Sequence, residues 1–269
     1  MRGRETEGSF GKTGRRPPAG PRVFGKTVRP AGETLKAAQA PGRAGLNRLS
    51  RNGNGLKRGM KMKADGLRAF LRAAAERMAE KKDWLIELDS RAGDSDLGLT
   101  MSDGFAAAAK AAGDSDLEDI GKLAYTAGKA MASAVPSTMG TLMASGLMQA
   151  GKVLKGKEEL DAQEEAAFFE AYFDGVQQRG KAKVGEKTFL DGLWPAAESL
   201  KAAAEKGRLT AEDAENAAAA AEQAFENTKG MKAVHGRMAI RGEASRELYD
   251  PGAAVAMLLM RAYADTKKA

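Results

Sequence analysis

The amino-acid sequence predicts an all-α protein of eight helices, and three observations support this. Residues 64–269 are rich in Ala, Leu, Met, Glu and Lys, which are the residues that favour helix most strongly. Val, Ile and Tyr, which favour strands, are sparse in the same range. Apolar residues there recur at intervals of three and four, which places them on one face of a helix.

The elements follow in chain order. The first helix ends near Leu88, and its apolar face consists of Leu67, Phe70, Leu71, Ala74 and Met78. The next six helices are expected at 98–112, 117–134, 138–155, 162–178, 188–206 and 211–228. Asp116 and Thr210 suit the N-cap positions of two of them, because short polar side chains accept hydrogen bonds from free backbone N–H groups. The last helix opens with Asp250 as N-cap and Pro251 in first position, and no segment is a convincing strand.

The basic character of the chain belongs to its N-terminal part. Residues 1–63 contain 16 Lys and Arg against 3 Asp and Glu, whereas residues 64–269 contain 27 against 33. The N-terminal part also holds 5 of the 8 prolines and 12 of the 32 glycines. Such a stretch buries too little apolar surface to offset its ordering entropy. We therefore expect residues 1–60 to be a disordered basic tail and residues 61–269 to form the folded domain.

Three interpretations of this tail remain open. It could bind nucleic acid or another anionic surface, precede a natural start at Met60 or Met62, or serve as a solvated linker. Only Phe10 and Phe24 interleave with its basic residues, which disfavours nucleic-acid binding.

Composition also excludes several classes of function. The chain has no cysteine and one histidine, His235, which excludes disulfide scaffolds, thiolate–zinc sites, cysteine nucleophiles and His-rich metal sites. No apolar run reaches the ~18 residues that span a bilayer, and no signal peptide is evident at the N-terminus. A cytoplasmic protein without a membrane partner is expected.

The stretch LDSRAGDSDLGLTM brings Asp89, Asp94 and Asp96 close together between two predicted helices. A turn built on Gly93 and Gly98 would let the three carboxylates converge, and they would repel one another unless a cation neutralised them. Oxygen-only ligands select a hard cation, and Mg²⁺ completes its octahedron with waters and phosphates. The free N–H groups of a helix that starts at Gly98 suit those phosphates. The sequence thus predicts a magnesium–phosphate site.

Two alternatives to a magnesium site arise from the same residues. A calcium-binding EF-hand requires an acidic residue at the twelfth loop position, which counted from Asp89 is Thr100. Helix capping by the aspartates remains open. The hexapeptide AGDSDL also occurs a second time, at 112–117, where Asp114 and Asp116 are interpreted as ordinary cap and solvent residues.

Two further segments fit a nucleotide site. The turn VPSTMGT at 135–141 places hydroxyls and backbone amides at a helix start, and it could equally be only a helix start. The predicted polar loop 229–249 carries Arg237, Arg241 and Arg246, fixed cations suited to phosphate. His235 in this loop is either a ligand contact or incidental.

Three motifs together resemble a known family, the L subunit of dihydroxyacetone kinase and the equivalent nucleotide domain of single-chain kinases. The motif L-D-x-x-x-G-D-x-D-x-G is present at 88–98. GKAKVGEKTFLD at 180–191 is similar to G-K-x-x-x-G-D-K-T-M-x-D, and GRMAIRGEASRELYDPGA at 236–253 is similar to G-R-A-S-Y-x-G-E-R-S-x-G-x-x-D-P-G-A. The motifs lie in order and span most of 66–260, whereas 1–60 lies outside the resemblance.

The resemblance implies an eight-helix antiparallel barrel with a nucleotide at one end. It implies two Mg²⁺ ions held by Asp89, Asp94 and Asp96, which with Arg237 form the catalytic group. It implies nucleotide contacts by Leu97, Gly98, Leu99, Thr100, Ser137, Thr138 and Arg237 on the phosphate and ribose side, and by Gly180, Phe189, Asp250, Pro251 and Gly252 on the adenine and lid side. The chain departs from the family pattern at Ser95, where glycine is usual, and at Leu97, where histidine is frequent.

The function implied by the resemblance is that of half an enzyme. The chain would present the phosphoryl end of ADP or ATP to a separate K subunit that holds a small ketose such as dihydroxyacetone. A phosphoprotein could recharge a bound ADP, and a homodimer is a further expectation. Three alternatives stay open, namely a nucleotide domain like that of fatty-acid kinase, a regulatory module that senses Mg–nucleotide without turnover, and a structural helical bundle with a basic arm.

Overall fold

The structure is a computed structural model that describes residues 61–268. The predicted basic tail, residues 1–60, lies outside the described residues. The described helices are α1 (Ala64–Glu80), α2 (Lys82–Ser90), α3 (Leu97–Gly113), α4 (Ile120–Ala134), α5 (Thr138–Val153), α6 (Ala162–Gly180), α7 (Phe189–Ala204), α8 (Ala211–Asn227), the 3₁₀-helix η1 (Arg237–Glu247) and α9 (Pro251–Lys268). Two short strands accompany them, β1 (Met62–Lys63) and β2 (Glu159–Leu160).

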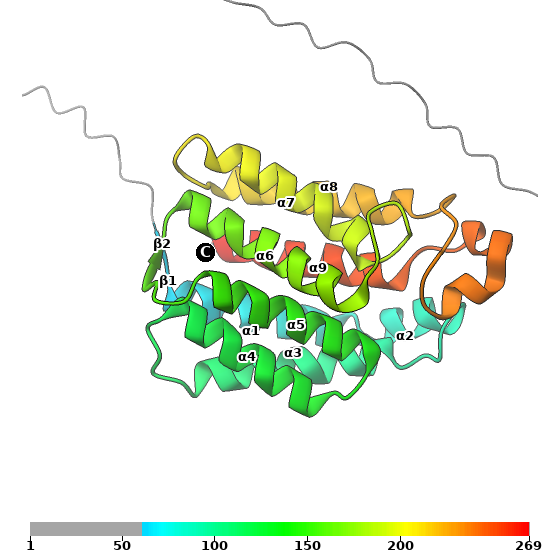
Figure 1. Ribbon diagram of the computed structural model, residues 1–269, viewed down its shortest axis with the longest axis horizontal. Coiled ribbons are helices and arrows are strands. Elements are labelled where there is room, and N and C mark those ends of the chain that lie inside the picture. The colour runs from blue at the N-terminus through cyan, green and yellow to red at the C-terminus, as the bar shows by residue number, and fades with distance from the viewer. Residues whose placement is uncertain (1–60, 269) are drawn as a thin grey trace, which may run out of the picture. The chain divides into compact units, whose positions relative to one another are not determined.

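Eight of these helices form a ring. Helices α1 and α3 to α9 pack against one another in chain order, and α9 closes the ring against α1. Figure 1 shows α2 and η1 at one end of this helical body and the two strands at the other. The all-α class and the eight-helix barrel are therefore confirmed, and α2 is a ninth α-helix outside the ring.

The first predicted helix is in fact two helices. The chain breaks at Lys81, whose ψ of 10° is not helical. Helix α2 then packs against α3 and α9, and Trp84 meets Phe225 of α8 edge to face. Periodicity could not predict this break, because Lys81 and its neighbours favour helix and the new direction is set by distant partners.

The predicted cap of the third helix is wrong. Asp119, not Asp116, caps α4, since its carboxylate accepts hydrogen bonds from the backbone N–H groups of Lys122 and Gly156 at 2.9 and 3.1 Å. The chain before it is held outside the helix by Arg68, whose guanidinium donates to three backbone carbonyls. These carbonyls belong to Ala112, Ser115 and Leu117.

Two other expectations need correction. The two-residue strands β1 and β2 pair antiparallel, with Met62 opposite Leu160, and they are too short to leave a periodic pattern. The expected loop 229–249 contains η1, whose sequence mixes charged and apolar residues without a helical stripe.

Small residues let the helices approach closely. Gly121 of α4 faces Gly151 of α5, and a Cβ atom on Gly121 would lie 2.6 Å from the Gly151 carbonyl oxygen.

The core contains a group of aromatic rings, in which Phe70 meets Phe169 and Tyr263 edge to face. The buried Tyr263 hydroxyl donates to Glu165 at 2.8 Å, because a buried polar group needs a partner. Within the described part of the chain, no helix has the length and apolarity to cross a membrane.

Candidate functional site

A cavity of about 1010 Å³ lies at the end of the ring that carries α2 and η1. Its walls come from the α2–α3 connection, the starts of α5, α7 and α9, the end of α6 and the start of η1. Cavities for small ligands commonly measure about 300 to 1,000 Å³. The space is therefore sufficient for a nucleotide.

Four helices begin at this cavity. Leu97 opens α3, Ser137 precedes α5, Thr188 precedes α7 and Pro251 opens α9, and all four residues line the cavity. Each helix start presents free N–H groups and the positive end of a helix dipole. Four such ends around one space favour an anionic ligand such as a polyphosphate.

Three carboxylates meet at the same end of the cavity. Asp89, Asp94 and Asp96 each offer an oxygen, and these oxygens lie within 4.8 Å of one another. The turn is tight, since the N–H of Gly93 donates to the Asp89 carbonyl at 2.5 Å. A Cβ atom on Gly93 would lie 2.0 Å from Asp89 Oδ1, so glycine is needed here for the carboxylates to converge.

The carboxylates are unfavourable to one another without a cation. Burial raises the pKa of Asp89, and the nearby Asp94 raises it further. Burial and the charges of Asp94 and Asp89 also raise the pKa of Asp96. Arg237 contacts Asp94 at 2.5 Å between Nη2 and Oδ2, which neutralises part of this charge. Oxygen donors grouped in this way fit Mg²⁺, whose charge would remove the remaining repulsion.

Helix capping does not account for Asp96, although backbone N–H groups at the start of α3 donate to the Asp89 carboxylate. Asp96 occupies the N-cap of α3, yet its side chain makes no capping hydrogen bond. The N-cap side chains of α4 to α8 all accept one. In the second copy of the hexapeptide, Asp114 instead pairs with Lys110 on the surface at 2.5 Å. The two copies therefore have different environments, as the sequence predicts.

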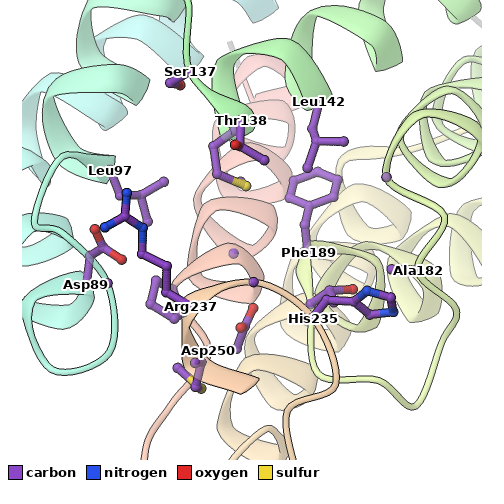
Figure 2. Close-up of a pocket in the computed structure, with 18 of the residues that line it drawn as sticks. Asp89, Leu97, Ser137, Thr138, Leu142, Ala182, Phe189, His235, Arg237 and Asp250 are labelled. Atoms are coloured by element: carbon purple, nitrogen blue, oxygen red, sulfur yellow. The ribbon is translucent and has the colours of Figure 1, made fainter. Parts of the chain in front are cut away.

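The other end of the cavity carries apolar side chains beside His235. Figure 2 shows Leu142, Phe189 and Ala182 at some distance from Asp89 and Arg237. Phe189 is 2% exposed, and its ring centroid lies 6.0 Å from that of Tyr172. One charged end and one apolar end suit a ligand that joins phosphates to a flat base.

The turn before α5 is both a helix start and part of the cavity wall. Ser137 Oγ accepts a hydrogen bond from the N–H of Gly140 at 3.0 Å and so caps the helix. Ser137 and Thr138 also line the cavity. Because the cap uses the Ser137 oxygen as acceptor, its hydroxyl hydrogen can still be donated to a ligand.

His235 lines the cavity and is held in place by an acidic residue. Its Nε2 atom lies 2.5 Å from Glu186 Oε2, and Figure 2 shows the ring near Ala182. The histidine therefore links two cavity loops, the one before α7 and the one before η1.

The structure gathers most of the predicted nucleotide contacts around this cavity, but not all. Those that line it are Asp89, Asp94, Asp96, Leu97, Ser137, Thr138, Gly180, Phe189, Arg237, Asp250, Pro251 and Gly252. Gly98, Leu99 and Thr100 are not among the lining residues. Gly98 instead lies against α2, where an added Cβ would be 2.2 Å from the Lys82 carbonyl oxygen, and Leu99 is 50% exposed. Successive residues of α3 point in different directions, so Leu97 can face the cavity while the next residues face elsewhere. The linear motif does not show this difference.

Sequence reasoning missed several lining residues. Lys187, Thr188, Ala182 and Leu142 line the cavity and were not among the predicted contacts. Thr188 was detectable, since Thr188 and Asp191 form a capping box at the start of α7. Lys187 was not, because its surroundings depend on segments distant in sequence.

The buried N-cap of α9 makes stability depend on pH. Burial raises the pKa of Asp250 to about 7, against the opposing effect of the N–H of Ala253, which donates to Asp250 at 2.6 Å. The folded chain therefore keeps a proton that the unfolded chain has already lost. The stabilisation from this group is complete below the ordinary carboxyl pKa and is lost as the pH rises to about 7.

We expect Asp250→Asn to remove this dependence, because asparagine still caps the helix but does not ionise. The difference in unfolding free energy between variant and wild type should change by at most about 4 kcal/mol between pH 4 and pH 8, in favour of the variant at the higher pH. Urea unfolding across this range measures it. Parallel pH curves for the two proteins would contradict the prediction.

The residue that departs from the family pattern at 95 carries backbone strain. Ser95 has a φ of 65°, a region that costs a residue with a Cβ about 1–2 kcal/mol. Ser95→Gly should raise the unfolding free energy by about 0.5 kcal/mol, since the freedom of glycine in the unfolded chain offsets about 0.4–1 kcal/mol. Urea unfolding tests this, and Ser95→Ala, which retains the Cβ, should show no gain. An equal gain in both variants would assign the effect to the hydroxyl.

Comparisons with known proteins agree with this geometry. The DAK2 domain profile matches residues 91–265. The chain is 32% identical over 198 residues to the ADP-binding subunit DhaL of PEP-dependent dihydroxyacetone kinase 1 from Listeria innocua, which covers 74% of this chain and 94% of that subunit. It is 31% identical to the corresponding Escherichia coli subunit, with 71% of this chain and 91% of that subunit covered. The resemblance indicated by the three motifs is thereby confirmed.

Among solved structures, the dihydroxyacetone kinase from C. freundii in complex with AMP-PNP and Mg²⁺ has a TM-score of 0.58 and 20% sequence identity. The match covers 84% of this chain and 38% of that kinase. At this identity, the similarity establishes the all-α fold.

Proposed function

Because the chain belongs to the DAK2 domain family, we propose that it binds Mg–ADP or Mg–ATP in this cavity and is the phosphoryl-transfer subunit of a dihydroxyacetone-type kinase. One observation carries the proposal. Three convergent carboxylates, which repel phosphate, share a cavity with four helix starts, which attract it. A magnesium–polyphosphate ligand satisfies both groups at once.

The residues have separate roles in this proposal. Asp89, Asp94 and Asp96 would hold magnesium, and we propose two ions. Magnesium neutralises charge on the phosphates and orients them for transfer. Arg237 would give up some of its contact with Asp94 and donate those hydrogen bonds to phosphate, since a guanidinium suits both carboxylate and phosphate. Phe189 would face the base at the apolar end of the cavity.

In phosphoryl transfer the protein mainly positions the groups and stabilises charge. The N–H groups at the start of α5 and the hydroxyls of Ser137 and Thr138 would orient the phosphates toward the cavity opening. Gly98 would act indirectly, by fixing the start of α3 against α2. The acceptor oxygen must come within about 3–3.5 Å of the phosphorus atom.

We propose that a separate sugar-binding K subunit supplies that acceptor. The support comes from relatives whose names describe an ADP-binding subunit of a dihydroxyacetone kinase. The kinase from C. freundii also extends well beyond the 38% of its length that is matched here. A small ketose such as dihydroxyacetone is the proposed substrate, and the cofactors are Mg²⁺ with ADP or ATP.

Nucleotide binding is tested by thermal unfolding with and without Mg–ADP. At about 100 times the dissociation constant, the ligand should add roughly 2.7 kcal/mol to the unfolding free energy. EDTA should remove the gain. A protein whose unfolding is unaffected by Mg–ADP and by Mg–ATP would be a structural helical bundle, and the proposal would fail.

Transfer is tested by mixing the protein with K subunits, ATP and dihydroxyacetone, and measuring sugar phosphate. If the protein keeps ADP bound, the assay uses a phosphorylated donor protein in place of ATP. We expect product only when both subunits are present. Nucleotide binding without product from any K subunit would favour the sensing module, and product from a fatty-acid acceptor would favour the fatty-acid-kinase alternative.

A further inference from the structure

Lys187 is a buried cation with an unusual set of partners. Its side chain is among the largest that are fully buried, at 1% exposure. Its ammonium donates to three backbone carbonyls, those of Met231, Ser245 and Leu248, at 3.2, 2.6 and 2.5 Å. An ammonium has three N–H donors, so all of them are used within the protein.

This arrangement distinguishes Lys187 from a phosphate-binding lysine. It lines the cavity, but none of its donors is left for a ligand unless a carbonyl contact breaks. All three carbonyls belong to residues 229–249, which we call the cover segment. This segment joins α8 to α9 and carries Arg237.

Apart from the Lys187 contacts, the cover segment is attached to the body at a few points, which include the stacking of Tyr249 on Phe225, with ring centroids 5.0 Å apart, and the Arg237–Asp94 pair. Its buried apolar residues Ala233 and Met238 form a small cluster with Ala92, separate from the main core. Ile240 is 88% exposed. The other contacts with the loop before α7 are the His235–Glu186 pair and a 3.3 Å hydrogen bond from Val234 to Glu186.

The base of the Lys187 side chain is fixed by the start of α7. The neighbouring N–H of Thr188 donates to Asp191 at 2.7 Å, and that of Gly185 donates to the same carboxylate at 2.5 Å. Lys187 has a φ of 61°, a strained conformation for a residue with a side chain. A glycine would adopt this backbone freely, so the lysine is retained at a conformational cost.

We propose that Lys187 is a positioning residue that holds the cover segment over the cavity and so places Arg237 at the aspartate cluster. It acts by joining three points of the segment to the rigid start of α7. The effect on nucleotide affinity rests on the proposed function, whereas the effect on the cover segment does not.

The first test measures amide hydrogen exchange in the full-length protein without nucleotide. Lys187→Met should speed exchange in residues 229–249 by about 10- to 100-fold, since hydrogen bonds to a charged group are lost. Exchange in α3 to α6 should stay unchanged. Lys181→Met is the matched control, because Lys181 has a similar φ of 62° but is exposed and does not line the cavity.

Two further variants distinguish the effect of the ammonium from the effect of the strained backbone. Lys187→Gly relieves the strain but lacks the ammonium, so it should remain folded and exchange as fast as Lys187→Met. Lys187→Arg retains charged donors and should regain part of the protection. Unchanged exchange in the cover segment, faster exchange throughout the barrel, or an arginine variant as labile as the methionine variant would each overturn the proposal.

The second test measures Mg–ADP affinity by titration calorimetry. Lys187→Met and Lys187→Gly should bind about tenfold more weakly or worse, whereas Lys181→Met should bind like the wild type. If the wild type binds no nucleotide, the proposed function fails but hydrogen exchange still tests the role of Lys187. If the variants bind normally while the cover segment exchanges faster, the placement of Arg237 by Lys187 is wrong.

Discussion

Asp94→Asn is expected to abolish magnesium-dependent nucleotide binding. Removing a residue that hydrogen-bonds to a metal ligand commonly lowers metal affinity 10- to 100-fold. Removing the charge of a ligand itself should therefore lower nucleotide affinity at least about 100-fold. Asp94 also pairs with Arg237, which links the aspartate cluster to the cover segment. Calorimetric titration with ADP at saturating Mg²⁺ measures the loss, and circular dichroism checks that the fold is intact.

The repeated hexapeptide supplies the matched control. Asp114 occupies the same place in the second AGDSDL as Asp94 does in the first, but it pairs with Lys110 on the surface at the end of α3. Exposed ion pairs contribute little, so Asp114→Asn should leave nucleotide affinity unchanged. If both variants lost the same nucleotide affinity, the assignment of the site to the first copy of the hexapeptide would be wrong.

Much of this architecture could be predicted from local sequence. The 3–4 spacing identified the helices, and Thr210 and Asp250 identified two of the N-caps. The acidic loop was predictable because its three ligands lie within eight positions, so local turn geometry alone brings them together. Local signals of this kind need no knowledge of distant partners.

What could not be predicted depends on contacts between distant segments. Nothing near Lys81 marks the break between α1 and α2, which follows from the packing of Trp84 against Phe225. Lys187 resembles an ordinary basic loop residue until the cover segment surrounds it. The family motif also groups Gly98 with Asp96, although the structure gives Gly98 a packing role rather than a place in the cavity wall.

That packing role makes Gly98→Ala the second large prediction. The new Cβ would lie 2.2 Å from the Lys82 carbonyl oxygen and 2.7 Å from Ile86 Cγ1, so α3 must shift away from α2. Overpacking against backbone should cost about 3 kcal/mol, which lowers the melting temperature by roughly 6–12 °C. Because Asp96 and Leu97 directly precede Gly98, a shift of about 1 Å should also reduce transfer about 100-fold.

Gly113 at the other end of α3 provides the comparison. No atom lies within 4 Å of a Cβ placed there, so Gly113→Ala should stabilise the protein by about 0.4–1 kcal/mol through the unfolded state. Thermal unfolding of both variants measures stability, and sugar-phosphate formation with a K subunit measures transfer. If Gly98→Ala melted and transferred phosphate like the wild type, the contact between α2 and α3 would not determine the position of the aspartate cluster. The start of α3 would then adjust freely, and the indirect role proposed for Gly98 would be wrong.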